Sequence, residues 1–235
     1  MSTGPRPHPI GIVACSAEGA SLCYRTICAE GAQRLGPHAH PEVAMHSHSL
    51  ADYVACIERD DWVGVADLML DSARKLAAVG AALLICPDNT IHQAMAHVLP
   101  STPRPWLHIA EVVLAEAAAR GHRHIGLTGT RWLVDSAVYP AACARPTPEQ
   151  RDAVHRIIMD ELVYGVFKPE SVAELLRVID SLRGRGCDAV VLGCTELPLV
   201  IDDRNASLPT LDSTRLLARA ALRAAVRADT ALAAR

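Results

Sequence analysis

Short apolar runs alternate with longer amphipathic segments along most of this chain. The short runs have the length and continuous apolar character of buried strands, and the longer segments repeat apolar residues at the helical period. The expected strands are residues 10–15, 43–48, 83–86, 124–129, 189–194 and 208–212. The expected helices are a segment ending near Leu35, then residues 60–79, 90–99, 109–120, 148–164, 170–183 and 213 onward. Strands that alternate with helices in this way predict mostly parallel sheets flanked by helices.

A proline-rich stretch, residues 100–105, interrupts the pattern, which then starts again. Such a stretch is typical of a linker. We therefore expect an α/β protein of two similar lobes with the active site in the cleft between them. The first lobe would comprise residues 1–105 together with a returning helix over 214–235, and the second would comprise residues 106–213.

The composition narrows the classes of function. Half of the residues are apolar but only 3% are aromatic, so the core is expected to consist of aliphatic side chains. The net charge is −3 and no basic stripe is visible, which argues against a nucleic-acid partner. There is no apolar run of bilayer length and no secretory signal pattern. The eight cysteines lack metal-ligand spacing, which favours free thiols in the cytoplasm.

Chemically capable residues follow two of the expected strands. Gly193-Cys194-Thr195-Glu196 stands at the carboxyl end of one strand, and Asp88-Asn89-Thr90 follows another. The carboxyl ends of parallel strands are where open α/β sheets bind ligands. A helix beginning after Cys194 would favour its thiolate or a substrate carboxylate. The alternative is that Cys194 is a buried structural residue.

Three motifs together resemble the aspartate/glutamate racemase family, whose members racemise amino acids without pyridoxal phosphate. The motifs are Val190–Leu199, which contains Gly-Cys-Thr-Glu, then Leu208–Thr214 and Glu161–Gly165. The resemblance extends from Ile10 to Thr214. It implies a cofactor-independent isomerase that forms a homodimer and acts on a small amino acid or carboxylic acid.

The chain departs from the family at its first signature, Cys-Asn-Thr followed shortly by His. The matching residues are Asp88-Asn89-Thr90 and then His92, so the resemblance places Asp88 where the family has its first catalytic cysteine. Racemisation needs an acid and a base on opposite faces of Cα, and we expect Asp88 and Cys194 to fill these roles. Burial would raise the pKa of Asp88 towards the range that a general acid needs. Asp88 could instead cap the following helix, or do both.

The resemblance also implies a cradle for the substrate carboxylate. Its expected members are Ser16, Asn89, Thr90, Thr130 and Thr195. Each of them could equally be an ordinary cap or turn residue. No arginine occurs between Arg34 and Arg59, where family members often bind a distal carboxylate, so specificity for acidic amino acids is doubtful.

Two histidines in the expected strand 43–48 are possible metal ligands. His46 and His48 would share one face of the strand, but no third ligand with suitable spacing is visible, so no metal site is expected. They could instead bind a distal substrate group.

Two other functions stay open. One is a decarboxylase or isomerase of malonate- or maleate-type acids that uses a single cysteine. The other is an amino-acid-binding homologue without turnover. The sequence leaves open the substrate side chain, the stereochemical preference and the role of Cys86.

Overall fold

The computed structural model describes residues 6–227, which divide into two compact units. The first unit contains the chain up to Pro87, Ala94–Ile109 and the chain from Leu217 onward. The second contains Asp88–Gln93 and Ala110–Leu216. Residues 88–93, expected with the first lobe, therefore group with the second unit. The last residues of the expected final helix, 228–235, lie outside the described range.

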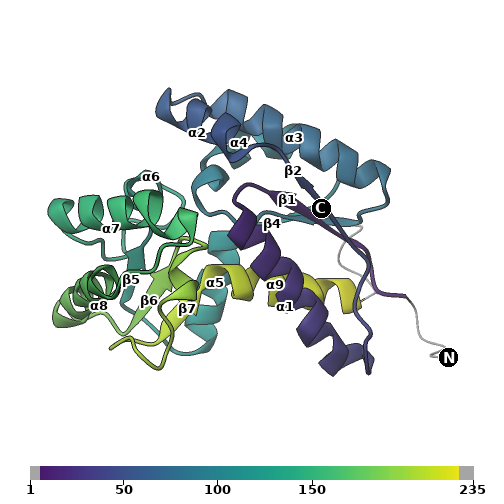
Figure 1. Cartoon of the computed structure of the whole chain (residues 1–235). Helices are drawn as coiled ribbons and strands as arrows, with labels where there is room; N and C mark the ends of the chain where they lie inside the picture. Colours follow the sequence, from purple (N-terminus) through teal and green to yellow (C-terminus); the bar gives the residue numbers. More distant parts are fainter. Residues whose placement is uncertain (1–5, 228–235) are drawn as a thin grey trace. The chain divides into compact units, whose positions relative to one another are not determined.

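The first unit is built on a parallel sheet in the order β2-β1-β3-β4. Its strands are β1 (Ile10–Ala14), β2 (Val43–Ser47), β3 (Leu83–Ile85) and β4 (Trp106–Leu107). Its helices are α1 (Ala17–Leu35), α2 (Leu50–Glu58), α3 (Trp62–Ala78), α4 (Met95–Val98) and the short 3-10 helix η2 (Leu99–Ser101). In Figure 1, α3 lies on one side of this sheet and α1 on the other.

The second unit carries a parallel sheet in the order β5-β6-β7. Its strands are β5 (Ile125–Thr128), β6 (Ala189–Leu192) and β7 (Thr210–Asp212). Its α-helices are α6 (Arg131–Val134), α7 (Pro148–Asp160) and α8 (Pro169–Gly184), with α5 (Ile109–Ala119) entering it and α9 (Ser213–Val226) leaving it (Figure 1). Its 3-10 helices are η1 (Thr90–Ala94), η3 (Leu162–Tyr164) and η4 (Leu197–Leu199).

The prediction of mostly parallel sheets flanked by helices is confirmed, and the structure adds several short elements, among them α2, β4 and the four-residue α6. Helix α2 was not expected, although Ser49 caps it and Tyr53 and Ile57 bury one face at a spacing of four residues. Strand β4 has only two residues, too few to show an alternation. It follows the proline-rich stretch and pairs with β3, so that stretch leads back into the first sheet.

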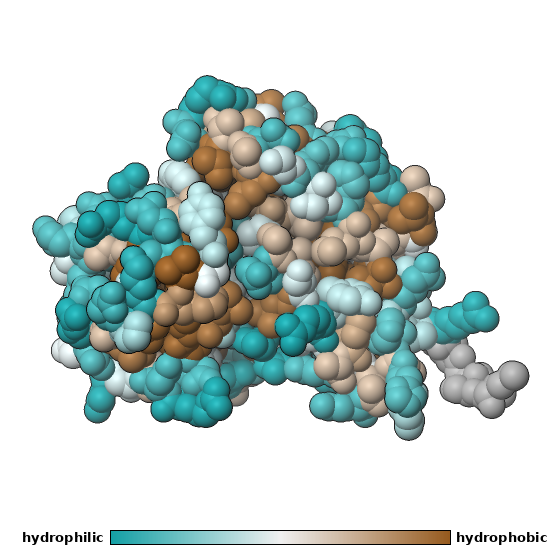
Figure 2. Space-filling view, in the orientation of Figure 1, coloured by the Kyte–Doolittle hydropathy of each residue, from teal (hydrophilic) through white to brown (hydrophobic). Residues whose placement is uncertain are grey.

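The cores are aliphatic, as the composition indicates. In the first unit β1 and β3 are buried at every position. In the second, β6 is buried throughout and packs against residues of α7 and α8 such as Val154 and Leu182. The face drawn in Figure 2 is largely hydrophilic, with apolar residues in smaller patches. None of the helices within residues 6–227 combines the length and apolar character that crossing a bilayer demands.

Candidate active site

The site begins where β6 leaves the core of the second unit. The Gly193 N–H donates to the Thr128 carbonyl at 2.9 Å, which extends the pairing of β5 and β6 by one residue. An added Cβ on Gly193 would lie 2.5 Å from Leu133 Cδ2 and 2.6 Å from the Thr128 oxygen. Only glycine fits this approach without displacing its neighbours. The close contact sets the point at which Cys194 leaves the sheet.

The side chains of Cys194 and Glu196 are joined by a hydrogen bond. Its Sγ donates to Glu196 Oε2 at 2.7 Å, and the Thr195 hydroxyl donates to the same oxygen at 2.8 Å. Thr195 and Glu196 are buried, with exposed fractions of 2% and 3%, whereas Cys194 retains partial exposure. The turn therefore holds a buried carboxylate against the thiol of a residue that is itself partly exposed.

The electrostatics of Cys194 correct one expectation. Burial raises the pKa of this thiol well above its usual value, and the charge of Glu196 and its hydrogen bond raise the pKa further. The hydrogen bond from the Glu196 N–H favours the thiolate, as predicted, but the raising effects outweigh it. The pKa of Cys194 is therefore raised rather than lowered, and the thiol is the favoured form at neutral pH.

Asp88 lies in the same unit, just before η1. Its Oδ1 accepts from the Ile91 N–H at 3.2 Å, so the capping interpretation is correct. The carboxylate is half-buried and also acts on Cys194, because its charge contributes to the raised pKa of the thiol. Asp88 thus combines a local structural bond with an electrostatic influence on the second candidate catalytic residue. Cys86, by contrast, is completely buried at the end of β3.

Asn89 belongs to a buried polar network. Its Oδ1 accepts from the Tyr139 hydroxyl at 2.8 Å, and its Nδ2 donates to Ser213 Oγ at 2.9 Å. Ser213 Oγ in turn donates to the Leu192 carbonyl at the end of β6 at 2.8 Å. Burial raises the pKa of Tyr139, so its hydroxyl stays protonated and donates. Asn89 therefore joins the start of η1 to β6, and a substrate contact would have to use its second N–H.

The remaining expected cradle residues lie at helix starts and turns. The Thr90 and Thr130 hydroxyls are 3.3 Å apart and both side chains are buried. Thr130 also caps α6 by accepting from the Leu133 N–H at 3.4 Å. Ser16 lies in the first unit, where it caps α1 by accepting from Gly19 N–H at 3.3 Å. The structure thus brings Asp88, Asn89, Thr90, Thr130, Cys194 and Thr195 into one unit.

Three participants were missed from the sequence, namely Glu196, Tyr139 and Ser213. Glu196 stands in the Gly-Cys-Thr-Glu run and Ser213 in the closing motif, so both had a sequence signal without an assigned role. Tyr139 lies in a stretch without regular structure, 50 residues from Asn89. Only folding reveals that its hydroxyl reaches the amide.

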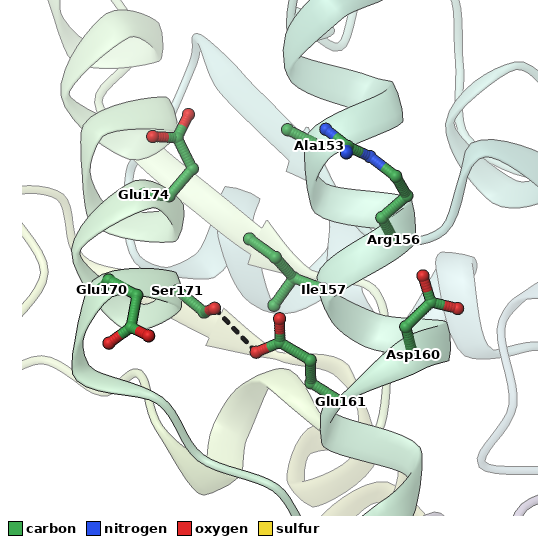
Figure 3. Close-up of a pocket in the computed structure, with 8 residues that line it drawn as sticks. All are labelled: Ala153, Arg156, Ile157, Asp160, Glu161, Glu170, Ser171 and Glu174. Atoms are coloured by element: carbon green, nitrogen blue, oxygen red, sulfur yellow. Dashed lines mark hydrogen bonds between the residues drawn. The ribbon is translucent and has the colours of Figure 1, made fainter.

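Two surface pockets lie away from these residues. One, of about 390 Å³, lies between α7 and α8 and is drawn in Figure 3. Four carboxylates and Arg156 line it, and Glu161 accepts a hydrogen bond from Ser171 at 2.6 Å. This bond links the end of α7 to the start of α8, a structural role. The second pocket lies between α2 and α3 of the first unit, with His48 and Asp71 in its lining.

Known proteins resemble the chain along nearly its whole described length. The model of the family described as Asp/Glu/Hydantoin racemase matches residues 10–221. The broad specificity amino-acid racemase RacX of Bacillus subtilis (strain 168) is 24% identical over 155 residues, covering 64% of this chain and 68% of RacX.

Solved structures share the fold. The crystal structure of a candidate Asp/Glu racemase from Yersinia pestis matches with a TM-score of 0.85 and 28% identity, covering 94% of this chain and all of that one. PH1733, an aspartate racemase homologue from Pyrococcus horikoshii OT3, matches with a TM-score of 0.79 and 25% identity. The match covers 92% of this chain and 98% of PH1733. The resemblance drawn from the sequence motifs is therefore confirmed, and the chain belongs to the Asp/Glu/hydantoin racemase family of isomerases.

Proposed function

We propose that this protein is a cofactor-independent amino-acid racemase or epimerase in which Asp88 and Cys194 exchange protons with the substrate Cα. The observation that carries the proposal is the environment of Cys194. Cys194 is a partly exposed residue at the carboxyl edge of a parallel sheet, and its thiol donates a hydrogen bond to the buried Glu196 carboxylate. Burial raises the pKa of the thiol, and the charges of Glu196 and Asp88 raise it further. Family membership supplies the class of reaction.

The raised pKa of the thiol indicates which residue acts as acid and which as base in each direction of the reaction. In one direction the Asp88 carboxylate removes the Cα proton, and the electron pair of the broken C–H bond moves into the substrate carboxyl group. The Cys194 thiol then donates its proton to the opposite face and becomes a thiolate. In the reverse direction the thiolate removes the proton and protonated Asp88 donates one.

The Glu196 carboxylate favours re-protonation of the Cys194 thiolate after each turnover. After Cys194 has given its proton to the substrate, the thiolate lies beside the Glu196 carboxylate that accepted its hydrogen bond. Two negative charges so close together are unfavourable in a buried environment, so the thiolate takes up a proton from water while protonated Asp88 releases its proton to water. The same carboxylate can accept the thiol proton when Cys194 must act as a base.

The substrate carboxylate would bind near the buried hydroxyls of Thr90 and Thr130. They lie 3.3 Å apart, close enough for both to contact one carboxylate. Asn89 and Thr195 of the same unit complete the proposed cradle within it, while the part expected for Ser16 of the first unit stays a prediction from the sequence. Because no arginine occurs between Arg34 and Arg59, we propose a substrate with a neutral side chain.

Loss of deuterium from Cα-deuterated amino acids in ordinary water, followed by NMR, tests the proposal. A panel of neutral and acidic amino acids identifies the substrate at the same time. We expect Cys194→Ala and Asp88→Asn each to slow racemisation by about 10³-fold or more, because each removes one of two essential proton-transfer groups. Asparagine is also a good helix cap, so the second variant keeps the local bond and removes only the acid.

Cys28→Ala is the matched control. Cys28 is a half-buried cysteine in α1 and takes no part in the site, so this variant should keep full activity. Unchanged exchange in Cys194→Ala would overturn the assignment. Release of carbon dioxide from a substituted malonate, undiminished in Asp88→Asn, would instead identify a single-cysteine decarboxylase. Tight binding of an amino acid without any exchange would identify a protein that binds without turnover.

A further inference from the structure

A second cluster of chemically capable side chains lies at the edge of the first unit. His46 is in β2, His48 follows directly after it, and Asp71 is in α3. One donor atom from each of the three residues lies within 4.8 Å of the others. His48 Nε2 is 2.8 Å from Asp71 Oδ2, and the two imidazole rings meet edge to face at 4.9 Å. The third ligand that the sequence lacked therefore comes from a helix 23 positions further along.

The histidine rings are held in place by their surroundings. His46 Nδ1 lies 2.9 Å from the hydroxyl of Ser72, which is completely buried. A hydrogen bond between Nδ1 and the Ser72 hydroxyl fixes the orientation of the His46 ring and leaves Nε2 to bind a metal. His48 Nε2 is itself shielded from solvent and has no well-directed hydrogen-bond partner among residues 6–227, although the Asp71 carboxylate is beside it.

One side chain competes with a cation for the Asp71 carboxylate. The Lys75 ammonium, 2.6 Å from Asp71 Oδ2, is the competitor that a metal would displace.

The cluster opens onto the groove between α2 and α3. This cavity has a volume of about 480 Å³ and is lined by both His48 and Asp71. Two further carboxylates, Asp52 and Asp67, line it and favour a cation, while Arg59 is the opposing charge. An ion bound by the three side chains would thus have a coordination position facing water or a small ligand in the groove.

We propose that His46, His48 and Asp71 bind a divalent transition-metal ion, with Zn²⁺ as the best fit. Two imidazoles and a carboxylate are a common donor set for zinc, and three protein ligands leave the fourth position open. Ligands about 2.1 Å from a tetrahedral ion lie about 3.4 Å apart. When the ion binds, the widest donor separation must therefore close by up to about 1.4 Å, and the His48–Asp71 pair, now 2.8 Å apart, must open slightly. This site is independent of the racemase chemistry, since no residue is shared with it.

Titration of the untagged full-length protein with Co²⁺, followed by visible absorption, tests the proposal. We expect saturation at one ion per chain and the weak bands of nitrogen and oxygen ligation. His48→Gln and Asp71→Asn should each weaken binding by at least about 10-fold, because each removes one of three ligands. Competition by Zn²⁺ should abolish the signal.

The double variant His38→Gln/His40→Gln is the matched control. It removes the neighbouring His-X-His pair, which belongs to no such donor group among the described residues, and its binding should equal that of the unaltered protein. A thermal-unfolding midpoint that Zn²⁺ raises in the control but not in Asp71→Asn would support the same site without reference to absorption.

Three results would overturn the proposal. One is binding that Asp71→Asn and His48→Gln leave unchanged while circular dichroism shows both variants folded. Another is intense sulfur-to-cobalt charge-transfer absorption, which would mean that cysteine thiolates bind the ion. Failure to saturate at one ion per chain would equally rule out the site.

Discussion

The thiol of Cys194 and the carboxylate of Glu196 lie 2.7 Å apart in a largely buried turn, so ionising both is costly. This residue-scale pairing keeps sulfur protonated and places a proton acceptor beside it. A thiol with a raised pKa is a better stored proton than a ready nucleophile. The arrangement therefore fits a cysteine that exchanges protons with carbon.

Replacing the carboxylate should separate these two effects. In Glu196→Gln the negative charge that raises the thiol pKa is gone, so the pKa of Cys194 falls and more thiolate is present at any given pH. Alkylation of Cys194 by iodoacetamide, followed by peptide mass spectrometry across a pH series, should reach its half-maximal rate at a lower pH than in the unaltered protein. Racemisation should nevertheless slow by about 10²-fold, because the proton acceptor is lost.

Glu161→Gln provides the comparison at the residue scale. Glu161 is another partly buried carboxylate of the second unit, bonded to Ser171 rather than to a thiol (Figure 3). Its loss should leave both the alkylation profile and the rate unchanged. An alkylation midpoint that stays fixed in Glu196→Gln would contradict the electrostatic role assigned to Glu196.

At the scale of the elements, the end of β6 is positioned by a close approach to β5 and α6. Gly193 permits it, because Leu133 of α6 and the Thr128 carbonyl of β5 occupy the space that a side chain would need. The Thr128 hydroxyl also donates to the Val191 carbonyl at 2.7 Å, which adds to the pairing of the two strands. The location of Cys194 thus depends on packing between elements as well as on its own turn.

We expect Gly193→Ala to lower the free energy of unfolding by about 1–3 kcal/mol, the usual cost of forcing extra volume into a packed core. It should also reduce racemisation, since Cys194 must shift with the strand end. Gly184→Ala is the matched control, because nothing lies within 4 Å of an added Cβ there and alanine favours the α8 helix. Urea unfolding of the two variants measures the difference, and equal stabilities would refute the packing argument.

At the scale of the whole molecule, α9 carries the chain from the second unit back into the first. From Leu217 onward its buried face consists of Leu217, Ala218, Ala221, Leu222 and Ala225. On its polar side, Arg219 forms a two-pronged ion pair with Glu30 of α1, with contacts of 2.8–3.0 Å. The first unit is therefore completed by residues more than a hundred positions away from its sheet.

We expect the buried apolar face of α9 to contribute more to the free energy of unfolding than the ion pair between Arg219 and Glu30. Leu222→Ala removes a completely buried side chain and should lower the free energy of unfolding by about 2–5 kcal/mol. Glu30→Gln weakens only a partly exposed pair and should cost less than about 1 kcal/mol. Urea unfolding monitored by circular dichroism compares the two. A larger loss in Glu30→Gln would show that the ion pair, rather than apolar packing, fixes α9 to the first unit.

The sequence by itself determined the α/β class, most of the strands and helices, and the family. These features depend on local periodicity and on contiguous motifs, which folding does not rearrange. It also marked Asp88 and Cys194, because each lies at the carboxyl end of an apolar strand and within a motif that resembles the family's signatures. Helix α2, with nine residues, and strand β4, with two, were not predicted, because such short elements give only a weak periodic signal.

Only the tertiary structure decided which side chains meet. Asp71 approaches His46 and His48 because α3 packs beside β2, and Tyr139 reaches Asn89 across 50 residues of chain. Burial of the thiol and the charge of Glu196 raise the pKa of Cys194, where the sequence alone suggested the opposite shift. Both effects depend on distance and burial. Periodicity along a chain fixes neither quantity, since both arise only when separate elements pack together.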